Sequence, residues 1–373
     1  MGVVAVLSLV AWIYLVVFHG RFWRTDQRLP PPLTPPQPLA PTGSWPSVTA
    51  IVPARNEALT LPHTLPTLVK QDYPGELTVL VVDDNSDDDT AGVAKDIGAT
   101  VTSCPAPGPG WAGKVNAMAH GLTTATSEYV LFTDADIAWK PGALRALVAS
   151  AGERGLVSQM VLLRTLTQGE RALIPAFVYF FAQLYPFRKV NDPGDRTAAA
   201  AGGCMLARRD ALPDGLDPVK DALIDDVAIG TMIKRSGRSI WLGLTKDITS
   251  ERPYPGLRDL WHMVARSAYT QLNYNPLILL GTILGLALTY LVPPAATIYG
   301  AVAGDVLATA AGAAAWALMT ASYLPMLRFY RLSALRAPTL PLIALTYTLM
   351  TLDSARRHYA RTPVPWRGPR PTP

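Results

Sequence analysis

Two carboxylates separated by one residue are the first feature of this 373-residue sequence that could do chemistry. Asp134 ends the apolar run YVLFTD at residues 129–134, and Asp136 follows two residues later. Carboxylates at the end of a buried strand are costly unless water or a cation solvates them. Their hard oxygen atoms suit Mg²⁺ or Mn²⁺ held jointly with substrate phosphates. The alternative interpretation is an Asx turn, followed by a helix that begins near Pro141.

Two more polar clusters, PARNE at residues 53–57 and DDNSDDDT at 83–90, also follow apolar runs. Aspartate and serine are natural in a solvated turn that caps the next helix, so the second cluster has a purely structural interpretation. A calcium-binding EF-hand loop is excluded, because Asp88 stands where that loop requires glycine and Ala94 where it requires glutamate. Carboxylates in this place could instead accept hydrogen bonds from a nucleobase and a ribose.

A lysine and a pair of aspartates complete the candidates. Lys114 ends the stretch GPGWAGK, which nearly matches a P-loop, but Val115 stands where Mg²⁺ requires serine or threonine, so nucleotide hydrolysis is rejected. Lys114 is then either a point charge that neutralises a diphosphate or a solvent-facing lysine at a helix start. Asp225 and Asp226 precede the helical run VAIGTMIKRSG. One of them is expected to cap the helix, and the other to face a cleft as a base.

From Val48 onward the sequence alternates between strand and helix patterns, and the candidate residues lie at the ends of these predicted elements. The apolar runs predict buried strands at 48–53, 77–82, 129–134 and 156–163, with helices between them at 57–70, 88–97, 113–125 and 141–153. This alternation predicts an α/β fold with a mostly parallel, Rossmann-like sheet that is covered on both faces. Chemistry in such sheets sits at the carboxyl ends of the strands, which is where the polar clusters fall.

The composition predicts that parts of the chain lie in a membrane. Only 16% of the residues are charged, against roughly a quarter in soluble domains, and the deficit is confined to four segments: 1–18, 267–304, 306–327 and 337–352. Residues 47–266 have an ordinary globular mixture, long enough for one good-sized core. A wholly soluble protein and a transporter without an extramembrane domain are both excluded.

The chain is therefore expected to have five parts. They are an N-terminal transmembrane anchor at 1–20, a basic and proline-rich linker at 21–46, the α/β domain at 47–255, an amphipathic interface helix at 256–274, and a C-terminal membrane region with a basic tail at 275–373. Arginines beside the apolar spans predict cytoplasmic loops, and so a multi-pass protein of the bacterial inner membrane with a cytoplasmic α/β domain. Nucleic acid is not an expected partner, because the globular part has no basic patch interleaved with aromatic residues.

The membrane-side helices are predicted in more detail. Residues 172–187 are expected to form a helix at the membrane interface, with a buried core helix as the alternative. In residues 257–272 a wide apolar stripe leaves Arg266 roughly 150° from its middle, so that the arginine would point to the globular domain. C-terminal spans are expected at about 276–293 and 306–327, and residues 338–352 are expected to be re-entrant or interfacial.

Six motifs in order resemble the inverting family 2 glycosyltransferases: PARNE, VVDDNSDDDT, GWAGKVNAM, FTDADI, GGCMLARRDAL and LIDDVAIG. Within that family the sequence is most similar to the hopene-associated membrane glycosyltransferases of hopanoid biosynthesis, from Val48 to about Pro294. The resemblance implies a GT-A fold, a nucleotide-diphosphate sugar donor (most commonly a UDP-sugar), Mg²⁺ or Mn²⁺, and a lipid acceptor.

The resemblance also implies roles on the donor side. The nucleoside pocket would be lined by five residues, among which Asp84 is the expected partner of the base: Pro53, Arg55, Glu57, Asp83 and Asp84. Lys114 would approach the diphosphate. Asp134 and Asp136 would form the DxD pair, with Asp136 as the metal ligand and Asp134 nearer the ribose or the metal.

On the acceptor side, Asp226 matches the catalytic base, and Gly202, Gly203 and Cys204 match an acceptor-side loop. Arg266 stands at the arginine of the Q-x-x-R-W motif, which here reads MVARS, and would help to stabilise the negative charge of the leaving phosphate. Because the tryptophan that would stack on an acceptor sugar is missing, elongation of a polysaccharide is not expected.

Two other functions are compatible with the same motifs. The first is transfer to a polyprenyl phosphate, an acceptor that is already anionic and needs no base. The second is a non-catalytic membrane protein that binds nucleotide sugars or lipids, against which the intact acidic residues and Arg266 count.

Overall fold

The computed structural model describes residues 1–31 and 44–360, which fall into two compact units. The sheet unit contains Asp26–Arg164 and Lys189–Arg252, and the helical unit contains Met1–Thr25, Thr165–Arg188 and the described residues from Pro253 onward. Residues 32–43, which are part of the predicted basic and proline-rich linker, and the basic tail at 361–373 lie outside the described residues.

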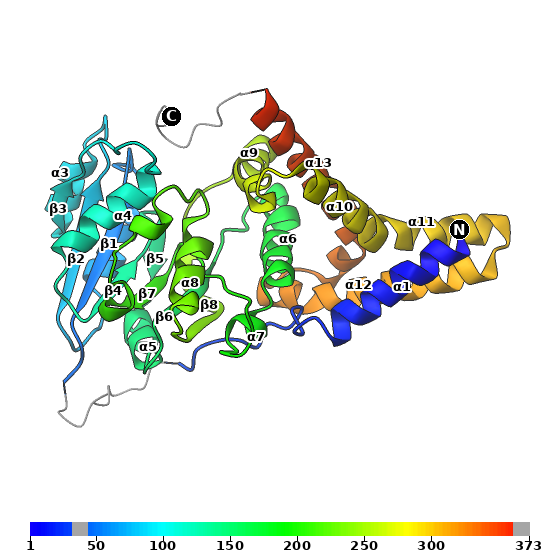
Figure 1. Ribbon diagram of the computed structural model, residues 1–373, viewed down its shortest axis with the longest axis horizontal. Coiled ribbons are helices and arrows are strands. Elements are labelled where there is room, and N and C mark those ends of the chain that lie inside the picture. The colour runs from blue at the N-terminus through cyan, green and yellow to red at the C-terminus, as the bar shows by residue number, and fades with distance from the viewer. Residues whose placement is uncertain (32–43, 361–373) are drawn as a thin grey trace. The chain divides into compact units, whose positions relative to one another are not determined.

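A mixed eight-stranded sheet in the order β3-β2-β1-β4-β7-β6-β8-β5 forms the centre of the sheet unit (Figure 1). Its strands are β1 (Val48–Ala54), β2 (Leu77–Asp83), β3 (Thr100–Ser103), β4 (Tyr129–Phe132), β5 (Ile137–Trp139), β6 (Leu156–Leu162), β7 (Met205–Arg208) and β8 (Ile240–Ser250). β1 is parallel to β2 and β4, β2 is parallel to β3, and β6 is parallel to β8. β7 runs antiparallel to β4 and β6, and β5 runs antiparallel to β8. The predicted α/β fold with a mostly parallel sheet is confirmed, and the four apolar runs are β1, β2, β4 and β6.

Helices cover both faces of this sheet, which explains why its strands are apolar almost without interruption. The helices of the sheet unit are α2 (Leu61–Val69), α3 (Thr90–Ile97), α4 (Gly113–Thr124), α5 (Ala143–Ala149) and α8 (Asp225–Arg235), and the short α7 (Phe187–Val190) spans the boundary between Arg188 and Lys189. Ala50 and Val52 of β1 belong to the core that α2, α3 and α5 share. Ile51 faces α4, where a Cβ added to Gly121 would lie 2.6 Å from the Ile51 Cγ2 atom. Only glycine allows α4 to approach β1 this closely.

The loops after β1 and β2 are tied together by hydrogen bonds. The Asn56 and Glu57 backbone N–H groups donate to the Ser86 Oγ atom at 3.0 Å and the Thr90 Oγ1 atom at 2.9 Å. The Asp87 N–H donates to the Asn56 Oδ1 atom at 2.7 Å. Since residues 57–60 form this connection, α2 begins at Leu61 and not at residue 57 as predicted. The two predicted polar clusters therefore form one interlocked edge.

Replacing Asn56 with alanine tests this interlock. Asn56 has a φ of +53°, a left-handed conformation that asparagine tolerates better than alanine. Asn56→Ala adds this backbone strain and removes the acceptor for the Asp87 N–H, so we expect a loss of about 1–3 kcal/mol of stability. Thermal unfolding of the purified protein measures this loss. Asn56→Gly, which relieves the strain but not the lost hydrogen bond, should recover part of it; equal melting temperatures for wild type and Asn56→Ala would contradict the account.

The helical unit consists mainly of long apolar helices. They are α1 (Gly2–Val17), α6 (Gln168–Leu184), α9 (Leu257–Ser267), α10 (Pro276–Leu286), α11 (Val292–Ala303), α12 (Val306–Phe329) and α13 (Leu340–Tyr359). A π-helical turn at Ala287–Leu291 joins α10 to α11. By length and composition, two stretches of the described chain could cross a bilayer, Pro276–Ala303 and Val306–Phe329. Membrane insertion of these stretches stays a prediction.

Side chains of α1 satisfy backbone groups that the π-helical turn leaves exposed. Pro293 has no N–H to donate to the carbonyl four residues earlier, that of Thr289. The Trp12 indole N–H donates to the Thr289 carbonyl, and the Ser8 hydroxyl donates to the Leu288 carbonyl at 2.7 Å. Trp12 is fully buried by this contact. An apolar helix pair can thus keep an irregular turn in its interior without unpaired carbonyls at Leu288 and Thr289.

Two predicted interfacial helices have buried faces inside the helical unit. α6 buries Tyr179 completely, and the Tyr179 hydroxyl lies 2.6 Å from the Ser322 hydroxyl. α6 therefore has the buried face that a core helix needs, and its contact with a membrane stays a prediction. In α9 the stripe residues Leu260 and Val264 are buried, while the Trp261 indole donates to Asp353 of α13 at 2.9 Å. Contact of α9 with a membrane stays a prediction.

Candidate active site

Polar residues from several strands meet at one edge of the sheet. β1, β2 and β4 are parallel, so their carboxyl ends lie together. β7 is antiparallel to both β4 and β6, so β6 runs in the same direction as β4. β8 is parallel to β6 and therefore also ends at this edge. The residues that follow these strands are the predicted clusters at 53–57, 83–90 and 134–136, together with residues 250–252. Lys114 and Asp226 stand at the first turns of α4 and α8. The predicted placement at the carboxyl edge is what the structure shows.

Arg55, Asp83 and Asp84 form one group at this edge. The Arg55 Nη1 atom lies 3.7 Å from the Asp84 Oδ2 atom, and Asp84 is almost completely buried. Burial raises the pKa of Asp84, and the Arg55 charge opposes the rise. The Asp83 Oδ1 atom is buried and has no hydrogen-bond partner among the described residues. Burial of a carboxylate oxygen without a hydrogen bond costs free energy, and a ligand that donates a hydrogen bond to it would remove this cost.

Lys114 holds two acidic segments together. Its Nζ atom lies 2.8 Å from the Asp134 Oδ1 atom and 3.0 Å from the Asp225 Oδ2 atom. Burial alone would lower the pKa of Lys114, but the carboxylates of Asp134, Asp225 and Asp226 outweigh burial and raise it. Lys114 is therefore a permanent cation among three carboxylates, and it joins the loop after β4 to the start of α8.

Asp226 presents a carboxylate whose orientation the backbone fixes. Its Oδ2 atom accepts a hydrogen bond from the Gly202 N–H at 2.9 Å, and its Oδ1 atom accepts one from the Val227 N–H at 2.8 Å. Burial, with help from the like charge of Asp225, raises the pKa of Asp226 to about 6, although Lys114 and the two N–H groups oppose the rise. A carboxylate with a pKa near neutrality is suited to take a proton in the physiological range.

The raised pKa of Asp226 predicts the pH dependence of any reaction in which it acts as a base. Below a pH of about 6 the carboxyl group is protonated and cannot accept a proton, so the rate should fall tenfold per pH unit. Above that value the rate should reach a plateau. The pH profile of kcat, measured between pH 4.5 and 8, checks this; an acid limb near pH 4, the ordinary range of aspartate, would contradict it.

Asp136 is held from the end of β8. The Ser250 hydroxyl donates to the Asp136 Oδ2 atom at 2.6 Å, and the Arg252 Nε–H donates to the same atom at 3.4 Å. Arg252 also lies 3.6 Å from the Glu57 Oε1 atom, so it connects the clusters after β1 and β4. Arg252 and Ser250 were not among the predicted site residues, because β8 was not recognised as a strand.

The carboxylates of Asp134 and Asp136 offer hard oxygen ligands for a divalent cation. Burial together with the neighbouring charge of Asp136 raises the pKa of Asp134 against the opposing charge of Lys114. A cation would relieve this repulsion. Within residues 1–31 and 44–360, no three His, Cys, Asp or Glu side chains gather to hold a metal alone. Two carboxylates fit Mg²⁺ or Mn²⁺ that takes its other ligands from substrate phosphates and water.

The remaining predicted site residues fall into two classes. Pro53 lies in β1, directly before the interlocked loops. Arg266 is exposed at the end of α9, which belongs to the helical unit. Its predicted role in the reaction therefore stays a prediction.

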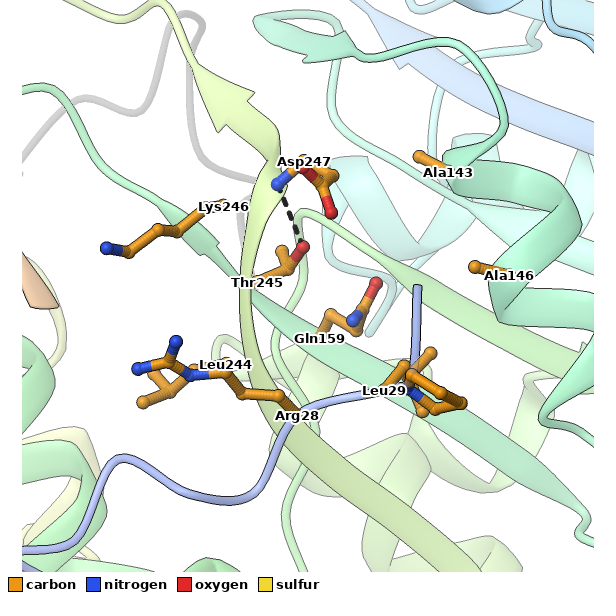
Figure 2. Close-up of a pocket in the computed structure, with 10 residues that line it drawn as sticks. Arg28, Leu29, Ala143, Ala146, Gln159, Leu244, Thr245, Lys246 and Asp247 are labelled. Carbon is orange, nitrogen blue, oxygen red and sulfur yellow. Dashed lines mark hydrogen bonds between the residues drawn. The ribbon is translucent and has the colours of Figure 1, made fainter. Parts of the chain in front are cut away.

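A cavity of about 130 Å³ lies elsewhere in the sheet unit (Figure 2). Residues 28–30, the start of α5, and parts of β6 and β8 enclose it; its lining includes Arg28, Ala143, Gln159 and Lys246. None of the predicted site residues lines this cavity, so it is separate from the carboxyl-edge cluster.

The sequence of the sheet unit can be compared with known protein families. Residues 49–216 match the model of the family Glycosyl transferase family 2. The chain has the α/β GT-A fold with long C-terminal helices in addition, and this segment is similar to the family 2 glycosyltransferases.

The chain is also similar to individual proteins of known name or structure. The 4,4'-diaponeurosporenoate glycosyltransferases of Staphylococcus aureus strains RF122 / ET3-1 and USA300 are 38% and 37% identical to the chain over 117 residues. These residues are 30% of this chain, and the chain spans only 31% of the length of these curated relatives. The solved structure of a mannosyltransferase from Pyrobaculum calidifontis, in complex with GDP-Man and Mn²⁺, is similar in fold with a TM-score of 0.56 and 20% identity. That similarity covers 97% of this chain and 99% of the mannosyltransferase.

Proposed function

We propose that the chain is a membrane-bound, metal-dependent, inverting glycosyltransferase that moves a sugar from a nucleotide-diphosphate sugar to a hydroxyl group of a lipid. One observation carries the proposal. Lys114 joins Asp134 to Asp225, beside a base candidate, Asp226, whose carboxylate two backbone N–H groups orient. This arrangement supports a site for phosphate charge next to a proton acceptor, which direct transfer requires.

The donor is held through its nucleoside and its diphosphate. Asp83 and Asp84 accept hydrogen bonds from the base and ribose, and Pro53, Arg55 and Glu57 complete that pocket. The buried Asp83 oxygen, which has no hydrogen-bond partner among the described residues, supports this assignment. Lys114 faces the diphosphate, and its charge opposes the negative charge that develops there. A UDP-sugar is the expected donor, while the solved mannosyltransferase of similar fold contains GDP-Man.

Transfer is a single displacement. Asp226 accepts the proton of the acceptor hydroxyl as its oxygen bonds to the anomeric carbon. The bond from that carbon to the diphosphate oxygen breaks in the same step, and the nucleoside diphosphate leaves with the electron pair. Attack from the side opposite the leaving group inverts the anomeric configuration. Arg266 is proposed to add positive charge at the leaving diphosphate.

Asp134 and Asp136 would hold Mg²⁺ or Mn²⁺, which when bound supplies positive charge to the leaving diphosphate. The hydrogen bonds from Ser250 and Arg252 orient the Asp136 carboxylate. The mannosyltransferase of similar fold was solved in complex with Mn²⁺, which supports a divalent ion of this kind.

A lipid is the proposed acceptor, in the inner membrane of a bacterium with the sheet unit in the cytoplasm. The two stretches long enough to cross a bilayer and the names of the Staphylococcus aureus relatives support it. The motif resemblance suggests a hopanoid, whereas those relatives are named for diaponeurosporenoate. A bulky isoprenoid lipid is common to both.

Comparison of the extractable lipids of a gene-deletion strain and its complemented parent, by mass spectrometry, tests the proposal. We expect one glycosylated lipid to disappear on deletion and to return with the wild-type gene, which reveals the sugar and the acceptor together. If the missing compound is a glycosylated polyprenyl phosphate, the acceptor is anionic, and an Asp226→Ala variant should keep most of its activity. Identical lipid profiles would contradict the proposed function.

A further inference from the structure

One face of α8 fastens a neighbouring segment of chain at three places. We call residues 189–202, which end at the glycine that donates to Asp226, the latch segment. Asp226, Gly230 and Lys234 are spaced by four residues along α8 and therefore share one face of the helix. Each of the three contacts a different part of the latch segment.

The contact at Lys234 is the most extensive. Its Nζ atom lies within hydrogen-bond distance of four backbone carbonyl oxygens: those of Lys189 at 3.2 Å, Val190 at 2.8 Å, Asp192 at 2.9 Å and Thr197 at 2.7 Å. An ammonium group has only three protons, so four carbonyls around it form a cage like that of a bound cation. Lys234 thereby holds together carbonyl groups that lie up to eight residues apart along the latch segment.

The contact at Gly230 depends on the absence of a side chain. A Cβ atom added there would lie 2.9 Å from the Ala199 carbonyl carbon and 3.1 Å from both the Ala199 oxygen and the Ala200 nitrogen. These are backbone atoms, which cannot rotate away. The buried residues Ala198–Ala201 therefore lie directly on α8 and lead to Gly202, whose N–H donates to Asp226.

We infer that Lys234 and Gly230 are positioning residues: they hold the latch segment on α8 so that the Gly202 N–H fixes the Asp226 carboxylate for proton transfer. The inference rests on the proposed function of Asp226 as the base. The groups that face Asp226 are Asp225 and the Val227 N–H on its own helix, Lys114 from α4, and the Gly202 N–H from the latch segment. Of these groups, only the Gly202 N–H belongs to the segment that Lys234 holds.

Loss of the cage has a defined kinetic signature. Without the Lys234 ammonium the latch segment loosens and the Gly202 hydrogen bond, which favours the ionised carboxylate, weakens. In Lys234→Ala we expect kcat to fall at least tenfold, the KM for the donor to stay within twofold, and the acid limb of the pH profile to move upward by about half a unit to one unit. n-Propylammonium, which replaces the missing atoms beyond Cβ, should restore kcat.

Arg235→Ala is the matched control, because Arg235 is the next residue of α8 and is exposed. It should leave kcat and the acid limb unchanged. Gly230→Ala, which pushes on the Ala199–Ala200 backbone, should reproduce the signature of Lys234→Ala without rescue by the amine. If Lys234→Ala has the kcat and acid limb of Arg235→Ala, whatever its yield or melting temperature, the inference is overturned.

Hydrogen exchange of the full chain separates this inference from the proposed function. Peptides that cover residues 198–204 should exchange faster in Lys234→Ala than in Arg235→Ala, whether or not a sugar is transferred. A wild-type protein that transfers no sugar would refute the proposed function alone. Unchanged exchange at these residues would refute the latch.

Discussion

Asp226→Asn is expected to lower the rate of sugar transfer by about 10²–10⁴-fold, which is the usual contribution of a positioned general base. Asparagine keeps the shape of the side chain, and its oxygen still accepts a hydrogen bond from the Gly202 N–H, so the fold should be retained. What disappears is the basic group that takes the proton of an alcohol, a weak nucleophile. Transfer assays with the purified full chain, together with thermal unfolding, measure both effects.

Asp214→Asn is a suitable control, because Asp214 is exposed and lies outside the carboxyl-edge cluster. It removes the same charge and should leave the rate unchanged. If Asp226→Asn retains full activity on the natural acceptor, Asp226 is not the base. An anionic acceptor that needs no base would then explain the reaction.

The second large effect is expected at Asp136. Asp136→Asn removes one of the two charged oxygen donors at the proposed cation site, so sugar transfer should be abolished. Binding of the donor should also lose its dependence on Mn²⁺. Isothermal titration of the wild type and the variant with the donor, with and without Mn²⁺, measures this dependence. Wild-type protein should bind the donor at least tenfold more tightly with the ion, and the variant equally with and without it.

Asp247→Asn serves as the control for Asp136, because Asp247 belongs to the same sheet but forms an exposed ion pair with Lys140. It should bind the donor like the wild type. Full activity in Asp136→Asn, or a donor affinity that still rises with Mn²⁺, would remove Asp136 from the cation site.

The parts of the fold that the sequence predicted are those with strong local patterns. β1, β2, β4 and β6 are short apolar runs bounded by polar residues, and they carry the acidic clusters at their carboxyl ends. β8 was missed because the half-buried Lys246 and the exposed Asp247 interrupt the apolar pattern of its sequence IWLGLTKDITS. Ser250 and Arg252, which hold Asp136, were missed with it.

Pairings between distant segments could not be predicted from the sequence. Lys114 was expected either at a diphosphate or in solvent, and its bonds to Asp134 and Asp225 depend on how α4, β4 and α8 come together. The role of Asp225 as a partner of Lys114 follows from the same packing, and not from its place at the start of a helix. Local sequence gives the residue types of the site, whereas tertiary packing decides which of them meet.

Transfer of radiolabelled sugar from a panel of nucleotide-diphosphate sugars into chloroform-extractable lipid, with membranes that contain the full chain, tests the central claim most directly. The account predicts label in one lipid from one donor when Mn²⁺ or Mg²⁺ is present, and none when the ion is chelated or Asp136 is replaced by asparagine. Absence of labelled lipid with every donor, or equal labelling with and without the divalent ion, would contradict it.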